Sequence, residues 1–295
     1  MALRDVLDPA LVCRAFAYAA QSRIFRSIAL VANPIKPMVA ASLRLSSDVR
    51  NSPHLGSLIR SLVIGVHRDI LEQVLSMELP QLRSIHFVVE LNPPGAVLIV
   101  SETTVDVMFA VLAAFPTVSS ISLSFLTFRS PRVFERIVRC FGSGVQTLAL
   151  QRICILRGAP HQTSPPPIVC PQITRLKLIS CAAAVSEKLS APSCPLDLQN
   201  LVDVTFTGPM SPAFIELLKS SQSTITRLTF EHFVGNQDLA FPLPALTHLS
   251  FDAVWILALA VVVQSPSHSP GLPSLREISL TVTDLDAPSL PQHAG

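Results

Sequence analysis

One short pattern recurs ten times along the chain, and this repetition limits the possible folds more than any other feature of the sequence. Each copy reads apolar-x-x-apolar-x-apolar, and the copies follow one another about every 28 residues. The apolar residues of the ten copies are Phe25-Ile28-Leu30, Ile59-Leu62-Ile64, Leu82-Ile85-Phe87, Val118-Ile121-Leu123, Val145-Leu148-Leu150, Ile173-Leu176-Leu178, Leu201-Val204-Phe206, Ile225-Leu228-Phe230, Leu246-Leu249-Phe251 and Leu275-Ile278-Leu280. Although 49% of the chain is hydrophobic, only four of the positions between these residues are apolar, namely Ala29, Val63, Ala149 and Val202. Such alternation predicts one short strand with a buried face in each copy.

Amphipathic segments separate several of the predicted strands and are expected to be helices. They cover residues 68–77, 104–114, 131–141 and 212–219. Two of them follow a serine and begin with a proline, after Ser130 and Ser211, which is typical of a helix N-cap with proline in the first turn. Strand, turn and helix repeating at this period predict a parallel sheet with right-handed crossovers. No unit can bury its apolar face alone, so we expect the units to stack.

The triples resemble the LxxLxL core of leucine-rich repeats. The family pattern continues with Asn or Cys three residues after the last apolar position, where this chain has Asn33 and Cys181 but other residue types in the remaining copies. The resemblance implies an α/β fold, a right-handed leucine-rich-repeat-like solenoid with a concave parallel β-sheet and helices on the convex side. It covers residues 24–285, and we expect the tail 286–295 to be frayed.

The N-terminal segment 3–28 carries a second resemblance. Its LVCRAF sequence, followed by IFRSI, is similar to the C-terminal half of an F-box, as in a large fungal family in which an F-box leads directly into irregular leucine-rich repeats. The resemblance implies a subunit that recruits a target protein to a cullin-type ubiquitin ligase through a small adaptor. Residues 1–23 would form a partial F-box-like helical cap, with Leu11, Val12 and Phe16 facing the adaptor or covering the first repeat. Because the Leu-Pro-x-Glu-type start of an F-box is missing, we expect weak adaptor binding or none.

Other functional classes find little support in the sequence. Nucleotide-binding, zinc-protease and serine-hydrolase motifs do not occur, so we predict no enzyme activity, no cofactor and no metal. The six cysteines form no CxxC pair and are interpreted as buried thiols in the cytoplasm or nucleus. A net charge of +2 with scattered basic residues predicts no nucleic-acid partner. The longest apolar run, 254–263, is too short to span a membrane and predicts a buried helix, so no membrane partner is expected.

Polar residues between the apolar ones are expected to share the concave surface, because side chains alternate along a strand. The position just before the second apolar residue predicts one row across the sheet: Ser61, Ser84, Ser120, Thr147, Arg175, Asp203, Arg227, His248 and Glu277. We predict a protein-binding patch in the charged half, made of Arg175, Lys177, Asp203, Arg227, Glu231, His248 and Asp252. A charge ladder that only satisfies itself, and a binding site on flanking loops, remain open as alternatives. So do a stand-alone scaffold without a ligase role and, more remotely, an enzyme with an unrecognised site.

Overall fold

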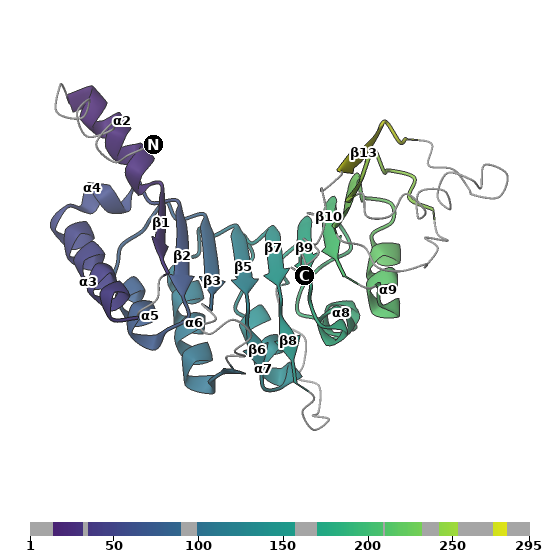
Figure 1. Cartoon of the computed structure of the whole chain (residues 1–295), viewed down its shortest axis with the longest axis horizontal. Coiled ribbons are helices and arrows are strands. Elements are labelled where there is room, and N and C mark those ends of the chain that lie inside the picture. The colour runs from purple at the N-terminus through teal and green to yellow at the C-terminus, as the bar shows by residue number, and fades with distance from the viewer. Residues whose placement is uncertain are drawn as a thin grey trace, which may run out of the picture.

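Ten strands form one parallel sheet in a computed structural model of the chain, which describes residues 14–31, 35–89, 99–156, 170–208, 210–231, 242–252 and 274–281. The strands are β1 (Ser27–Leu30), β2 (Ser61–Gly65), β3 (Ser84–Val88), β5 (Ser120–Ser124), β7 (Thr147–Gln151), β9 (Arg175–Ile179), β10 (Asp203–Thr207), β11 (Arg227–Glu231), β12 (His248–Asp252) and β13 (Glu277–Thr281). Their order in the sheet is their order in the chain, along a gently curved row (Figure 1). The predicted parallel sheet, with one strand from each copy, is therefore confirmed.

The register of the sheet aligns the repeats position by position. Leu62 of β2 is opposite Ile85 of β3, which is opposite Ile121 of β5, and the same alignment continues through Leu148 of β7. Each of these residues is the second apolar position of its copy, so the apolar side chains of neighbouring strands stack in continuous rows. The sheet therefore buries one face along its length, although no single unit has enough apolar surface to do so.

Burial alternates along the strands, as expected for a sheet with one covered face. In β2, Leu62 and Ile64 are fully buried, whereas Ser61, Val63 and Gly65 between them are half-buried. We call the side formed by these alternate, less buried positions the open face. The last strand departs from the prediction, because Ile278 is 43% exposed. Its strand, β13, pairs with β12 alone among the described strands, so one flank of Ile278 has no described neighbour.

All the described helices except α2 lie on the side of the sheet with the buried face. The described helices are α2 (Arg14–Phe25), α3 (Ile35–Asn51), α4 (Pro53–Gly56), α5 (Arg68–Leu75), α6 (Glu102–Ala114), α7 (Pro131–Val138), α8 (Ala183–Ser190) and α9 (Pro212–Ser220). Successive helices pack on one another, α3 on α5, α5 on α6, α6 on α7, and α8 on α9. Figure 1 shows them along the outer side of the curved row of strands, whereas α2 lies beyond its first end.

The four predicted helices are confirmed as α5, α6, α7 and α9, and three more, α3, α4 and α8, were not predicted. Ser211 caps α9 as expected, since its hydroxyl accepts a hydrogen bond from the Phe214 N–H at 3.2 Å. The prediction for Ser130 is confirmed in position, since Ser130 is the N-cap residue of α7. It is wrong about the hydrogen bond, because the Ser130 side chain makes no capping bond. The backbone of Ser130 is extended, as is usual for an N-cap residue, but this does not by itself place its hydroxyl within hydrogen-bond distance of a helix N–H.

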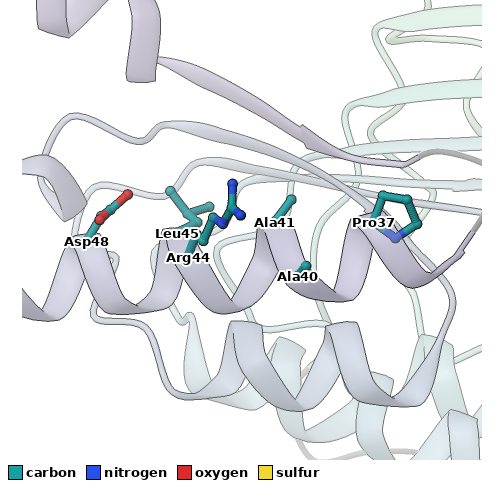
Figure 2. Close-up of a pocket in the computed structure, with 6 residues that line it drawn as sticks. All are labelled: Pro37, Ala40, Ala41, Arg44, Leu45 and Asp48. Carbon is teal, nitrogen blue, oxygen red and sulfur yellow. The ribbon is translucent and has the colours of Figure 1, made fainter.

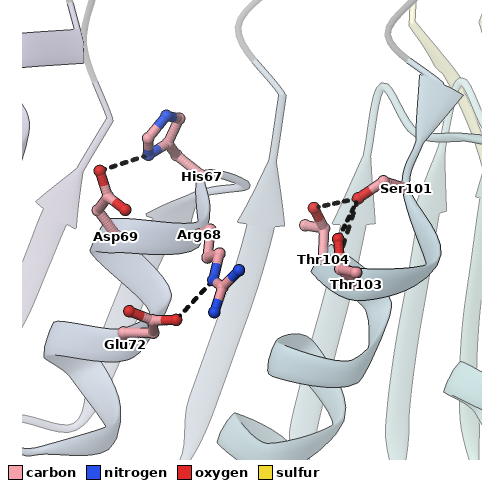
Figure 3. A network of polar contacts seen from close by, with 7 residues as sticks. All are labelled: His67, Arg68, Asp69, Glu72, Ser101, Thr103 and Thr104. Carbon is pink, nitrogen blue, oxygen red and sulfur yellow. Dashed lines mark hydrogen bonds and ion pairs between the residues drawn. The ribbon is translucent and has the colours of Figure 1, made fainter.

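Two other helix starts lie side by side in Figure 3, at α5 and α6. Ser101 caps α6 by accepting from the Thr104 N–H at 3.2 Å. At α5 no side chain caps the helix, and Arg68 instead donates to Glu72 one turn further on, at 2.6 Å. Nδ1 of His67 lies 3.8 Å from Asp69, which is an ion pair only when the histidine is protonated. These contacts hold helix starts in place and are all partly exposed to solvent.

A second, smaller parallel sheet lies below the first and was not predicted. It consists of β4 (Ile99–Val100), β6 (Thr127–Phe128) and β8 (Cys154–Ile155), each of which belongs to a different repeat. The turns into β6 and β8 pass through left-handed backbone at Phe125 and Arg152, with φ of 61° and 50°. Leu126 and Ile153 follow them and are buried at the position where leucine-rich repeats have Asn or Cys.

Several predictions fall outside the described residues. These are the apolar run 254–263, the tail 286–295 and the residues Leu11 and Val12. Phe16 belongs to α2, but its side chain is not among those described. None of the helices in the described ranges is both long and apolar enough to cross a membrane.

Candidate functional site

The open face carries the predicted row of polar residues in register. Ser61, Ser84, Ser120 and Thr147 are direct partners on β2, β3, β5 and β7. The row continues through Arg175, Asp203, Arg227, His248 and Glu277 on β9 to β13. The first half of the row therefore presents hydroxyl groups, and the second half presents charges. The change comes at β9, where two of the three open-face positions, Arg175 and Lys177, are basic.

The charged half of the open face, which we call the charged patch, brings the predicted binding residues together on four consecutive strands. Arg175 and Lys177 come from β9, Asp203 from β10, Arg227 and Glu231 from β11, and His248 from β12. Asp252 occupies the last position of β12, and its side chain lies outside the described ones. Neighbouring strands of a sheet are about 4.8 Å apart, so the described side chains form one continuous polar surface.

Glu231 is held from two sides. Nζ of Lys177 lies 3.3 Å from its Oε1, and the hydroxyl of Thr207 donates to its Oε2, also at 3.3 Å. The carboxylate is thereby fixed between β9 and β10 although it belongs to β11. The Lys177 and Glu231 side chains are 43% and 37% exposed, so water weakens this ion pair.

A second polar contact joins the last two strands. Nε2 of His248 lies 3.4 Å from Oε2 of Glu277, and the Thr247 hydroxyl lies 2.7 Å from Nδ1 of the same ring. The hydroxyl of Ser279 donates to Oε1 of Glu277 at 3.0 Å. Glu277 thus belongs to the patch by contact. The sequence pattern predicts Glu277 in the polar row, but the predicted patch does not include it. No feature of the sequence near Glu277 indicates its contact with His248.

Three charges in the middle of the patch remain without such contacts. Arg175, Asp203 and Arg227 are register neighbours on β9, β10 and β11, yet no ion pair or side-chain hydrogen bond joins any of them to another described residue. Arg175 and Arg227 are exposed, and Asp203 is half-buried. The alternative of a charge ladder that satisfies itself therefore describes Lys177 with Glu231 and His248 with Glu277, but not this central trio. Its polar atoms are available to an external partner.

A polar network in the uncharged half was not predicted. Nε2 of His86 on β3 lies 2.8 Å from the Ser124 hydroxyl on β5, which donates to Oε1 of Gln151 on β7 at 3.3 Å. Burial lowers the pKa of His86, so the neutral ring is favoured. Ser124 is only 1% exposed, so no substrate can reach its hydroxyl in this arrangement. The network instead links three strands. Its only signal in the sequence is that these residues occupy alternate strand positions.

A shallow depression on α3 is a concave feature among the described residues. Pro37, Ala40, Ala41, Arg44, Leu45 and Asp48 line it, all from one helix (Figure 2). Its lining is mostly small apolar side chains, with Arg44 and Asp48 as the polar groups. Nothing from another element converges on it, so the groups needed to orient a small ligand are not assembled there.

Four of the five described cysteines are half-buried, whereas Cys170 is exposed, so the predicted burial is wrong for Cys170. No disulfide joins them, and burial raises the pKa of Cys181 and of Cys194 to about 11. The thiol of Cys181 donates to the Leu150 carbonyl at 3.2 Å, across to the preceding repeat. Within the described ranges, no three His, Cys, Asp or Glu side chains gather closely enough to hold a metal ion.

No protein-family model matches this sequence, and no curated protein matches it either.

Proposed function

We propose that this chain is a leucine-rich-repeat-like solenoid that binds another protein through the charged patch and carries out no chemistry. The single observation that supports this most directly is the central trio, Arg175, Asp203 and Arg227. Three charged side chains stand in register on a sheet surface, and none of them has an ion-pair or side-chain hydrogen-bond partner among the described residues. A protein surface with complementary charges would satisfy them and would gain orientation and specificity in doing so.

The regular sheet supports the solenoid part of this proposal. Each unit adds one strand beside that of the preceding unit, and the helices on the covered face pack in the same succession. The open face is the side of the sheet that these helices leave uncovered, and it would be the concave surface of such a solenoid. Strands and helices hold such a surface rigid, so little conformational entropy is lost when a partner binds.

The test compares proteins captured by the full chain with those captured by single charge reversals. The variants are Arg175→Glu, Asp203→Arg and Arg227→Glu, with circular dichroism as the check of folding. Matched controls are Arg132→Glu on α7 and Glu187→Arg on α8, two exposed charges on the helical side. We expect one set of captured proteins to be lost in all three variants and kept in both controls. Retention of every captured protein by three folded variants would exclude the charged patch as the binding site.

The chain's place in a ligase is a separate part of the proposal. We propose a target-recognition subunit of F-box type, in which α2 belongs to the F-box-like cap; the alternative is a stand-alone scaffold using the same face. The helix α2 ends at Phe25, two residues before β1, as expected of a cap next to the first repeat. Purified ligase adaptor distinguishes the two roles. Adaptor bound by the full chain and released by Leu11→Asp and Phe16→Asp supports the ligase role, and absence of binding supports the scaffold.

A further inference from the structure

Three arginines lie side by side at the N-terminal ends of β1, β2 and β3, away from the charged patch. The residue just before each strand occupies an equivalent position, and we call the row of these residues the rim. On the first three strands the rim residues are Arg26, Arg60 and Arg83. Their backbones are hydrogen-bonded in succession: the Arg60 N–H donates to the Arg26 carbonyl at 3.0 Å, and the Arg83 N–H to the Arg60 carbonyl at 2.8 Å. The three residues are therefore direct neighbours, although 34 and 23 residues separate them along the chain.

All three side chains are exposed and lack a counter-charge. No carboxylate of the described residues forms an ion pair with Arg26, Arg60 or Arg83. The guanidinium of Arg83 has one neutral contact, a donation to the Thr117 carbonyl at 3.5 Å. Arg23, exposed near the end of α2, adds a further positive charge one helical turn before Arg26. Like charges on neighbouring strands repel one another, so this arrangement opposes folding.

Hydroxyl-bearing residues at other rim positions show how a short side chain can support the sheet there. The hydroxyl of Ser119 donates to the Arg83 carbonyl, and that of Thr174 to the Gln146 carbonyl, both at 3.4 Å. Thr247 donates in the same way to the Thr226 carbonyl, at 3.0 Å. A short hydroxyl side chain thus ties one unit to the preceding one. Arg60 and Arg83 lack this side-chain contact to the preceding unit, and the three arginines together add repulsion, so stability does not explain their presence.

We propose that Arg26, Arg60 and Arg83 form a binding site for an acidic segment of a partner protein, distinct from the charged patch and independent of the function proposed for it. Guanidinium groups bind carboxylates and phosphoryl groups through paired N–H donors. The three long, flexible arginine side chains start from adjacent strands about 4.8 Å apart, so they can reach acidic side chains on one side of a short extended segment, which lie about 6.6 Å apart. Nucleic acid fits less well, because its binding sites combine a wide basic surface with aromatic platforms, and the net charge of this chain is only +2.

The experiment measures binding of a fluorescent oligoglutamate peptide to the full chain by anisotropy at low salt. An oligoglutamine peptide of the same length tests the need for charge. A phosphoserine peptide shows whether phosphoryl groups are preferred to carboxylates, and a single-stranded oligonucleotide tests the other class of polyanion. The rim variant is Arg26→Glu with Arg60→Glu and Arg83→Glu. The control is Arg129→Glu with Arg132→Glu and Arg276→Glu, which has the same change in net charge at exposed sites. Arg276 occupies the rim position before β13, at the other end of the sheet from Arg26, Arg60 and Arg83.

We expect the rim variant to weaken binding of the acidic peptide at least about ten-fold and the control to change it less than about two-fold, with tighter binding at lower salt. Arg60→Gln alone tests whether the row has a structural role, because it removes repulsion and is expected to leave the melting temperature unchanged or higher. Three results would overturn the proposal: no binding of either acidic peptide by the unchanged chain, equal weakening in the rim and control variants, or tighter binding of the oligonucleotide than of both acidic peptides. A melting temperature lowered by Arg60→Gln would also contradict it.

Discussion

The ammonium group of Lys177 lies 3.3 Å from the carboxylate of Glu231, although the whole of β10 separates their strands. Lys177 occupies the third position of β9 and Glu231 the last position of β11, so the contact runs diagonally over the open face. It crosses above β10, whose Thr207 also donates to Glu231. Side chains on this face therefore connect units that are not neighbours in the repeat.

This ion pair is expected to contribute little to stability. We predict a coupling free energy of about 0.2–1 kcal/mol between Lys177 and Glu231, because both side chains are more than one-third exposed. A double-mutant cycle with Lys177→Ala and Glu231→Ala in urea unfolding measures it. Glu231→Ala should destabilise more than Lys177→Ala, since it also removes the acceptor of the Thr207 hydroxyl. Equal losses in the two single variants would contradict the two-sided arrangement around Glu231.

The two serine N-caps are expected to differ in their effect on stability. Ser211→Ala removes the acceptor of the Phe214 N–H and should lower the free energy of unfolding by about 1 kcal/mol. Ser130→Ala is the matched control, since Ser130 also precedes a proline at the start of a helix but makes no capping bond. Its expected effect is close to zero. Thermal unfolding followed by circular dichroism compares the two, and equal losses would contradict the assigned caps.

Left-handed backbone at the end of β9 is a site where glycine should stabilise the fold. Ser180 has φ of 49°, and its N–H donates to the Thr207 carbonyl at 2.9 Å. A residue with a Cβ atom loses roughly 1 kcal/mol in this region, so Ser180→Gly should raise the free energy of unfolding by up to about that amount. Ser180→Ala serves as the control and should change little. Urea unfolding measures both variants.

The same substitution should have the opposite effect at Phe125, where φ is 61°. The guanidinium of Arg152 lies over the Phe125 ring, 5.2 Å from its centre, and the ring packs against the core. Phe125→Gly removes both contacts and should destabilise the chain, despite the relief of backbone strain. A gain in stability at Phe125 would mean that backbone strain outweighs packing at this turn.

The stability of the fold should depend on pH through His86. Burial lowers the pKa of His86 in the folded chain below its ordinary value of 6.5. At mildly acidic pH, the His86 ring is therefore protonated more often in the unfolded chain than in the folded chain, which lowers the free energy of unfolding. The contribution of His86 is fully present above the unfolded pKa and is lost as pH falls through the folded one. His86→Gln removes this dependence and can keep a hydrogen bond to Ser124. Urea unfolding from neutral to mildly acidic pH should show a smaller loss in His86→Gln than in the unchanged chain, and parallel curves would contradict the assignment.

Much of the fold could be predicted without coordinates because the relevant signal is local. Alternation around Leu62 and Ile64 assigns each side chain to a face, and the same alternation in every copy aligns the strands in register. The row from Ser61 to Glu277 follows from these two facts alone. The short strands β4, β6 and β8 could not be predicted in this way, because two residues are too few to show any periodicity.

The arginine row shows where prediction from sequence ends. Basic residues look scattered along the chain, and that interpretation is wrong for Arg26, Arg60 and Arg83, which the sheet places next to one another. Their proximity depends on the length of each repeat, including α3 and α4 between Arg26 and Arg60. The same holds for Lys177 with Glu231 and for His86 with Ser124, since a contact between side chains of different units depends on rotamers and neighbours that no single unit specifies. Local alternation decides which face a residue occupies, whereas packing between units decides which charges meet there and which remain without a partner.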